Sequence, residues 1–344
     1  MHDLAPVLLP PHQIDHFYLG GDRIKALRGG PGGPRRPEEW IASVTTRAGE
    51  PGVGPSVLPD GTLLADRLAA DPDGWLGKDH VDRYGAGLEL LVKLLDAGQR
   101  LPVHVHPDRS FARRHLGLAH GKTEAWVVVD AEPGAVVGLG LKTALTQREL
   151  LDLVRSHDSA AILSAVHTRP ARPGDGILVP AGTPHFIGAG VLVVEVQEPT
   201  DLSIVLEWED LALDGDADGH LGLGFETALG AVDLTVWDAG EVDRMVRQLP
   251  PGATGLTTAL PDAADPYFRA SWVDAGNGVV VEAGLGVLVV LAGEGSLTTD
   301  CGRLSLRRGD VVLVPHASGT WTLEGSLKGV LCRPPAPDAP VPQR

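Results

Sequence analysis

The sequence predicts a mainly β protein built from closed or double-sheet barrels. Glycine and proline contribute 44 and 28 of the 344 residues, a content typical of many short strands joined by turns. A weak internal repeat supports this interpretation. Asp175 and Asp310 each follow a glycine and precede an apolar run that ends in proline five residues later. Few other segments have a helical pattern.

In the first half of the chain, turn residues and apolar runs alternate. Glycine and proline in residues 27–38 predict an irregular loop, and residues 61–77 are expected to form a short helix. Alternating or β-branched runs predict strands over residues 101–106 and 126–130. The apolar run over residues 88–95 fits either a strand or a helix segment.

A small helical insert then interrupts the β region. Thr146 and Glu149 have the spacing of a capping box, in which each side chain accepts from the other's backbone N–H, and apolar residues follow on one helical face. A second short helix is expected over residues 159–166. The insert therefore covers about residues 143–168.

The second half returns to short strands separated by glycine turns. An apolar strand ends at Pro180 and leads into the turn that closes at His185, and residues 191–197 form the next strand. Alternation places Glu195 and Gln197 on one face of that strand. Further strands are expected over residues 279–282, 286–292, 295–299 and 304–306.

Charge and cysteine content exclude several classes of function. The net charge of −16 argues against binding to nucleic acids or anionic membranes, and it also makes a phosphorylated substrate less favourable. Two cysteines, Cys301 and Cys332, cannot form a disulfide framework or a cysteine-rich metal site. The N-terminus lacks a signal-peptide pattern and no apolar run could span a membrane, so we expect a cytoplasmic protein.

Three histidines and one glutamate form a candidate metal site. His104 and His106 project from the same face if their segment is a strand, so two imidazoles can converge on one ion. Glu124 enters an apolar strand, where burial is costly without a cation, and His185 closes a tight turn. Each residue alone could equally lie at the surface, but together they predict a zinc site with nitrogen and oxygen ligands. We find no metal-ligand partner for the other histidines.

The chain resembles the type I, zinc-dependent mannose-6-phosphate isomerases. Several ordered blocks carry the resemblance, and they lie between about residues 35 and 210: Glu39-Trp40 with Ser43, residues 91–97, 105–108, 121–124, 180–185 with 187, 188 and 190, and 195–197 with Asp201. The family fold is a double cupin, two barrels in tandem, and it makes the run over residues 88–95 a strand. It implies a metal-binding domain over residues 1–235, a degenerate cupin over 236–334, and a disordered tail over 335–344.

The resemblance also implies chemistry and site residues. A proton moves between C1 and C2 of a sugar through an enediol, while one zinc ion, held by His104, His106, Glu124 and His185, orients or stabilises the sugar oxygens. His104 stands where the family has glutamine. Two further sets of positions match the family's active site, namely Lys122 and Glu195 as candidates for proton transfer, and Trp40 and Asp201 as candidates for substrate binding.

One departure from the family concerns the phosphate of the substrate. The family arginine that handles the anion falls on Val205 here, and a later basic position falls on Leu211. Phosphate gains most from paired cationic donors, so the sugar is either the 6-phosphate or an unphosphorylated relative. Two alternatives remain open from the sequence, a non-catalytic cupin that binds a sugar or metabolite and an iron dioxygenase. A monomer or weak dimer is expected by analogy.

Overall fold

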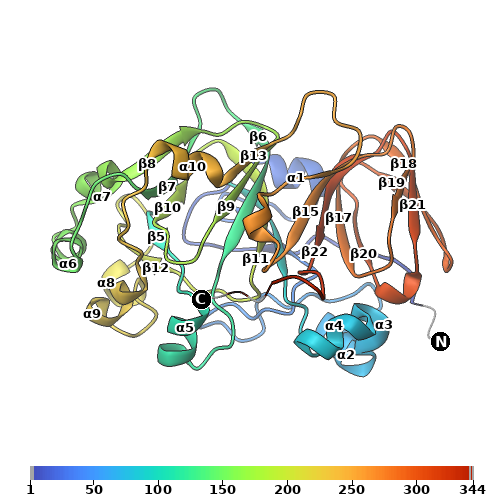
Figure 1. Ribbon diagram of the computed structural model, residues 1–344, viewed down its shortest axis with the longest axis horizontal. Helices are drawn as coiled ribbons and strands as arrows, with labels where there is room; N and C mark the ends of the chain where they lie inside the picture. Colours follow the sequence, from blue (N-terminus) through green and yellow to red (C-terminus); the bar gives the residue numbers. More distant parts are fainter. Residues whose placement is uncertain (1–3, 341, 343–344) are drawn as a thin grey trace.

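The protein consists of two β-barrel units that lie side by side (Figure 1), as seen in a computed structural model that describes residues 4–340 and 342. Each unit contains two sheets, and every pairing between named strands is antiparallel. This confirms the predicted mainly β fold of two barrels with a small helical insert.

The first barrel pairs a large sheet with a small one. The large sheet comprises β2 (Gln13–Ile14), β3 (Glu38–Ile41), β4 (Leu91–Asp96), β6 (Glu124–Ala131), β9 (Asp175–Val179), β11 (Val191–Gln197) and β13 (Val246–Gln248). The small sheet comprises β5 (His104–Val105), β7 (Val136–Leu141), β8 (Val166–Pro170), β10 (His185–Ile187) and β12 (Ile204–Val205). Their strand orders are β13–β9–β6–β11–β4–β3–β2 and β12–β5–β10–β7–β8.

The second barrel has the same two-sheet plan. Its larger sheet comprises β1 (Val7–Leu8), β14 (Gly255–Thr258), β15 (Arg269–Asp274), β17 (Gly286–Ala292), β20 (Val311–Val314) and β22 (Lys328–Arg333). Its smaller sheet comprises β16 (Val279–Val281), β18 (Glu294–Thr299), β19 (Gly302–Arg307) and β21 (Trp321–Gly325). The orders are β1–β20–β17–β22–β15–β14 and β16–β21–β18–β19.

Short helices cover the ends and flanks of the barrels (Figure 1). They are α1 (Arg23–Arg28), α2 (Leu64–Ala70), α3 (Pro72–Leu76), α4 (Lys78–Tyr84), α5 (Arg109–Phe111), α6 (Gln147–Arg155), α7 (Ser159–Ala165), α8 (Gly215–Asp218), α9 (Phe225–Ala228) and α10 (Ala239–Arg244), with a π-helical turn at Ala112–Leu116 and 3₁₀ turns at Leu229–Ala231, Asp262–Ala264 and His316–Ser318. Within the described residues, none of these helices has the length and apolar character that a membrane crossing requires.

The helical insert forms as its capping box predicts. Thr146 accepts from the backbone of Glu149 while the Glu149 carboxylate accepts from the backbone of Thr146, so α6 begins where expected and α7 follows. The single helix expected over residues 61–77 is instead divided into α2 and α3. Pro72 has no N–H to continue the first helix, and Asp71 caps the second by accepting from the Gly74 backbone.

A shared apolar core joins the two barrels. One face of the large first-barrel sheet contributes Val92, Leu94, Val194 and Val196, and these residues belong to one cluster with Val287, Val289 and Val311 of the second barrel. The sheet is therefore buried on both faces, which explains why the sequences of its strands are mostly apolar. The second barrel covers the back of the sheet whose other face looks into the first barrel.

Two strands cross between the halves of the chain. The N-terminal strand β1 pairs with β20 in the second barrel, and β13 pairs with β9 in the first. The boundary at residues 235/236 stays a prediction. Of the predicted tail, residues 341, 343 and 344 lie outside the described part. Within that part, the side chains of Tyr84 and Arg83 donate to the carbonyls of Ala336 and Ala339.

Candidate metal centre and active site

A row of side chains across the large sheet forms the floor of the candidate site. Trp40, Lys93, Glu195 and Trp126 are register partners on the neighbouring strands β3, β4, β11 and β6. Partners directly opposite one another point to the same face of a sheet. The alternation seen in the sequence thus brings two charged side chains between two tryptophans inside the first barrel.

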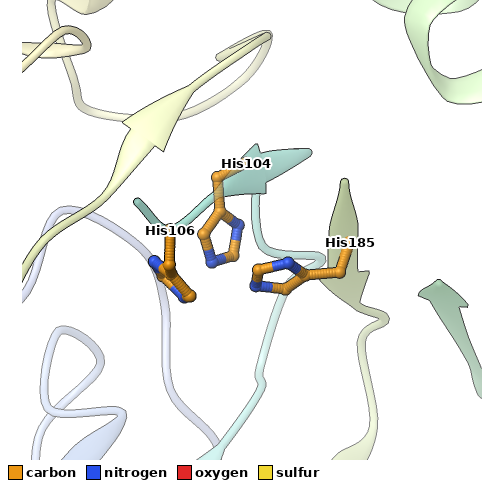
Figure 2. A group of neighbouring side chains, drawn as sticks. All are labelled: His104, His106 and His185. Atoms are coloured by element: carbon orange, nitrogen blue, oxygen red, sulfur yellow. The ribbon is translucent and has the colours of Figure 1, made fainter. Parts of the chain in front are cut away.

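The small sheet supplies three histidines from the opposite side. His104 lies on β5 and pairs in register with His185 on β10, while His106 follows the end of β5. The ring centroids are 4.1 Å apart for His104 and His185, 4.8 Å for His106 and His185, and 4.9 Å for His104 and His106. Figure 2 shows the three rings converging on one point, and one nitrogen of each lies within 4.8 Å of the others. Such a cluster could hold a metal ion.

Backbone carbonyls fix which nitrogen of each ring faces the centre. The Nδ1 atoms of His104, His106 and His185 lie 2.9, 2.6 and 2.7 Å from the carbonyl oxygens of Pro102, Leu202 and Thr183. A carbonyl only accepts, so each Nδ1 donates its proton, and each Nε2 of the neutral ring keeps a free lone pair. This arrangement is the usual outer support of histidines that bind metals.

Glu124 completes a group of acceptors that face one another. Its carboxylate oxygens lie 2.9 Å from His106 Nε2 and 3.4 Å from His185 Nε2, while Trp126 Nε1 donates to Oε1 at 2.9 Å. Among the described residues, His185 Nε2 is buried without a hydrogen-bond partner, and Glu124 Oε2 forms no hydrogen bond, although Lys122 Nζ lies within ion-pair distance of it. Converging lone pairs in a buried site call for a cation, so the residues present fit a divalent metal.

The electrostatic environment favours the deprotonated forms of His104, His106 and Glu124. Burial, followed by the neighbouring His185, holds the pKa of His104 well below its ordinary value, and burial together with Lys122 lowers the pKa of His106 to about 3. Burial alone would raise the pKa of Glu124, but Lys122 and His106 outweigh it and the pKa is lowered. Metals bind neutral imidazoles and carboxylates, so these three groups are in the protonation states that a metal needs near neutral pH.

Lys122 lies next to this group. Its Nζ is 3.1 Å from His106 Nε2 and 3.3 Å from Glu124 Oε2. The side chain is buried, so the ammonium group is one of the few proton donors that reach the centre. The structure thus brings together Lys122 and the four metal-site residues predicted from the sequence.

A second charged cluster, centred on Lys93, adjoins the metal-site residues. Lys93 Nζ lies 3.2 Å from Glu38 and 3.5 Å from Glu195, and Glu38 also accepts from Tyr18 and from Trp40 Nε1. Burial, followed by the charge of Glu124, raises the pKa of Glu195 to about 7. The pKa of Glu38 is lowered instead, because Lys93 and three further partners outweigh the effect of burial. Two carboxylates on one lysine therefore differ in proton affinity.

Sequence reasoning did not single out Glu38, Lys93, Tyr18 or His16, yet all four line the cavity above this floor. Lys93 and Trp40 were inside blocks of the family resemblance, and Glu38 lies two residues before Trp40, on the same face of β3. That spacing was the available signal for Glu38. Nothing in the sequence connected His16 or Tyr18 with strands so distant along the chain.

The predicted substrate-binding residues lie at different depths. Asp201 lines the cavity. Trp40 is 1% exposed and lies behind it, with its ring beneath Lys93 and its indole nitrogen donating to Glu38. Val205, at the position of the family arginine, lines the cavity directly. Leu211 does not line it but packs against the apolar cluster that includes Leu101 and Ile187 of the cavity wall.

No arginine lines the cavity in the described part of the chain. Two arginines nearby along the sequence are already paired, Arg100 with Glu207 and Arg109 with Glu198. Five further basic residues that could have replaced the family arginine do not line the cavity either; they are Arg35, Arg36, Arg113, Arg114 and Lys142.

Comparisons with known proteins identify relatives of this chain. No family model matches the chain. Over 241 residues the chain is 31% identical to the mannose-6-phosphate isomerase of Streptococcus mutans, covering 70% of this chain and 72% of that protein. Over 246 residues it is 30% identical to mannose-6-phosphate isomerase ManA of Bacillus subtilis, covering 70% and 73%.

Solved structures share the fold over nearly the whole chain. The mannose 6-phosphate isomerase from Bacillus subtilis superposes with a TM-score of 0.75 at 23% identity, covering 96% of this chain and all of that one. A mannose 6-phosphate isomerase bound with zinc and yttrium superposes with a TM-score of 0.73 at 15% identity, covering 97% and 100%. Two relatives at 30% identity or more, matched over more than two thirds of their length, show that the chain belongs to the family of mannose-6-phosphate isomerases, which are aldose–ketose isomerases.

Proposed function

We propose that this chain is a zinc-dependent aldose–ketose isomerase that interconverts a mannose-type aldose and its 2-ketose. The observation that carries the proposal is the convergence of three imidazole lone pairs and one carboxylate beside a second carboxylate, Glu195, whose pKa is about 7. A metal-binding group and a base that titrates near neutral pH are the two parts that this proton transfer needs.

The metal would be held by His104, His106, His185 and Glu124, one ion per chain. When bound, zinc acts as a Lewis acid that stabilises negative charge developing on the sugar oxygens. The lowered pKa values of His104, His106 and Glu124 and the carbonyl bonds behind the imidazoles support this assignment.

The chain's own side chains would move the proton. Glu195 accepts the proton from C2 of the aldose and returns it to C1. The proton of the C2 hydroxyl moves to O1, so the sugar gains and loses no atoms or electrons overall. Lys122 Nζ donates a hydrogen bond to the oxygen that becomes negatively charged. Lys93 holds the Glu195 carboxylate at 3.5 Å, and Asp201 accepts from a sugar hydroxyl at the cavity wall.

The charges that line the cavity favour an unphosphorylated sugar as the preferred substrate. Four carboxylates line it, against two lysines that are already paired with them. A divalent metal would balance this charge, and a phosphate dianion would then add two negative charges without an arginine to receive them. The 6-phosphate named for the relatives is the second candidate, favoured by their sequence similarity.

The test uses the purified metal-bound protein in deuterated water. We expect deuterium at C2 or C1 of mannose or fructose, detected by NMR, with slower exchange for mannose-6-phosphate and fructose-6-phosphate. Glu195→Gln should reduce exchange by about 100-fold or more while the metal remains bound. Absence of exchange for all four sugars would refute isomerisation of these sugars. Stoichiometric iron with oxygen consumption would instead support a dioxygenase.

A further inference from the structure

Two arginines of the second barrel face one another without an acid between them. Arg269 on β15 and Arg333 on β22 are direct register partners at the ends of their strands. Like charges at directly opposite positions destabilise a sheet. In a protein with a net charge of −16, such a pair of cations in contact range is unexpected unless something neutralises it.

Neither guanidinium is in an ion pair with a described residue. Arg333 donates only to the backbone carbonyls of Glu282, Ala283 and Leu285, and Arg269 donates only to the carbonyl of Pro334. In the described part of the chain, Nη1 of Arg333 and both Nη atoms of Arg269 therefore have no acceptor. The carbonyl bonds fix the orientation of both side chains and leave these donors available.

The two arginines share a cavity of about 410 Å³. It lies between the end of β22, the helices α3 and α4, and the segment over residues 334–338, with Lys78, His80 and His316 among its other lining residues. The lining acids Asp79, Glu282 and Asp338 are exposed and make no ion pair with either arginine. The free donors thus open onto a space large enough for a small molecule.

Burial makes the uncompensated charge more costly. Both side chains are half-buried, and burial lowers the pKa of each. For Arg333 the neighbouring charge of Arg269 lowers it further, to about 10. The carboxylates of Asp265 and Asp338 act on Arg269, and that of Glu282 acts on Arg333, without forming an ion pair with them. A pair of guanidinium forks that is held in place without an ion-paired acid is the arrangement that phosphoryl groups bind bidentately.

We propose that Arg269 and Arg333 form an anion-binding site on the second barrel for the phosphoryl group of a small molecule. The dianion would accept from the free Nη donors of both arginines and neutralise their repulsion. It would also tie the segment over residues 334–338 to β15 and β22. This site is separate from the metal centre, which lies inside the first barrel.

The test is the binding of inorganic phosphate to the full-length protein by isothermal titration calorimetry, with sodium chloride at matched ionic strength as the reference. We expect saturable binding, weakened at least tenfold by Arg269→Gln and by Arg333→Gln, because each removes charge-assisted hydrogen bonds. Arg303→Gln, an exposed arginine of the same barrel, is the matched control and should bind phosphate as the wild type does.

Isomerase activity and circular dichroism report whether each variant is folded. Arg333→Lys provides a second measurement that is independent of any change at the strand ends, since it keeps the charge but removes the fork, and its affinity should also fall. Absence of saturable binding by the wild type, or unchanged affinity in the Arg269 and Arg333 variants, would overturn the proposal. If phosphate binds only at the metal centre, its affinity will be unchanged in the Arg269 and Arg333 variants.

Discussion

The two barrels share an architecture but differ in what fills them. The interior of the second is an apolar cluster that includes Leu288, Leu297 and Trp321. The interior of the first contains a row with Lys93 and Glu195, which face three histidines. The second barrel shows that the fold needs only a packed interior. The polar interior of the first is thus a functional addition, stable because its charges are paired.

The difference arises at few positions. Both copies have the turn and strand that begin at Asp175 and Asp310, but Thr320 stands where the first copy has His185. Thr320 is exposed, whereas His185 is 1% exposed. The second copy thus lacks one of the proposed metal ligands, and its barrel covers the back of the sheet that forms the floor of the candidate site.

The largest effect is expected when the metal-binding group is broken. Glu124→Ala removes one ligand and leaves three imidazoles without a balancing carboxylate. Even loss of an outer-shell partner typically costs 10–100-fold, so we expect isomerase activity to fall by at least about 1,000-fold, with loss of bound zinc. Metal analysis by mass spectrometry and activity assays measure both, and full metal occupancy in the variant would contradict the ligand assignment. Thr320→Ala, at the matching site of the second barrel, should change neither.

Truncating the apolar interior of the second barrel should lower stability and leave the chemistry intact. Leu297 on β18 is fully buried, so Leu297→Ala should reduce the free energy of unfolding by about 2–5 kcal/mol. Urea denaturation measures this loss, and kcat of the folded variant should be unchanged. Val280→Ala on β16, where Val280 is 65% exposed, is the control and should cost less than about 0.5 kcal/mol. A large fall in kcat for Leu297→Ala would contradict this division of roles.

Glu195 should give the metal-free protein a stability that declines with pH. Its pKa is about 7 in the folded chain against an ordinary 4.5. The folded state therefore holds a proton between these values that the unfolded state has released, and stability falls as pH rises across this window. Glu195→Gln, which resembles the protonated acid, should gain up to about 3 kcal/mol relative to the wild type between pH 4.5 and 7.5.

Urea unfolding in the presence of a chelator measures that difference. Glu294→Gln, an exposed position in the second barrel, should follow the wild type at every pH. If the free energy of unfolding of Glu195→Gln equals that of the wild type at every pH, the pKa of Glu195 is not raised in the folded protein.

The smallest effect is expected from restoring a cation to the cavity. Val205→Arg places a guanidinium beside His104, the register partner of Val205. We expect the ratio of kcat/KM for mannose-6-phosphate to that for mannose to rise about tenfold, as one charge-assisted hydrogen bond would allow. Val205→Leu is the control for changes in cavity shape. An unchanged ratio in a folded Val205→Arg protein would show that the sugar's far end lies elsewhere.

Much of this arrangement is predictable from the sequence because it follows from alternation. The two-residue period places Glu195 inside the first barrel and Val194 in the shared core. The capping box at Thr146 marks the start of α6 for a similar reason, because it depends only on local spacing. The metal-site residues were also predicted from strand alternation and burial before the family resemblance, and the structure brings them together.

The remainder depended on contacts between distant segments. Tyr18 and His16 reach the cavity from a loop that has no periodic pattern, and Glu38 is recognisable only once Lys93 is known to face it. Strand lengths were also overestimated where proline intervenes, since Pro102 cannot donate to a ladder and β5 retains only His104 and Val105. No pattern in the neighbouring sequence predicts a pairing such as that of β1 with β20.

The exchange of β1 and β13 between the halves determines how the chain can be cut and rearranged. A cut after residue 235 would remove the partner of β9 from one half and the partner of β20 from the other, so each fragment would expose an unpaired edge. We therefore expect that neither barrel can be excised at this point and fused to another protein as an independent domain. A circular permutation that opens an exposed loop and keeps both strands attached is the form of rearrangement that the topology permits.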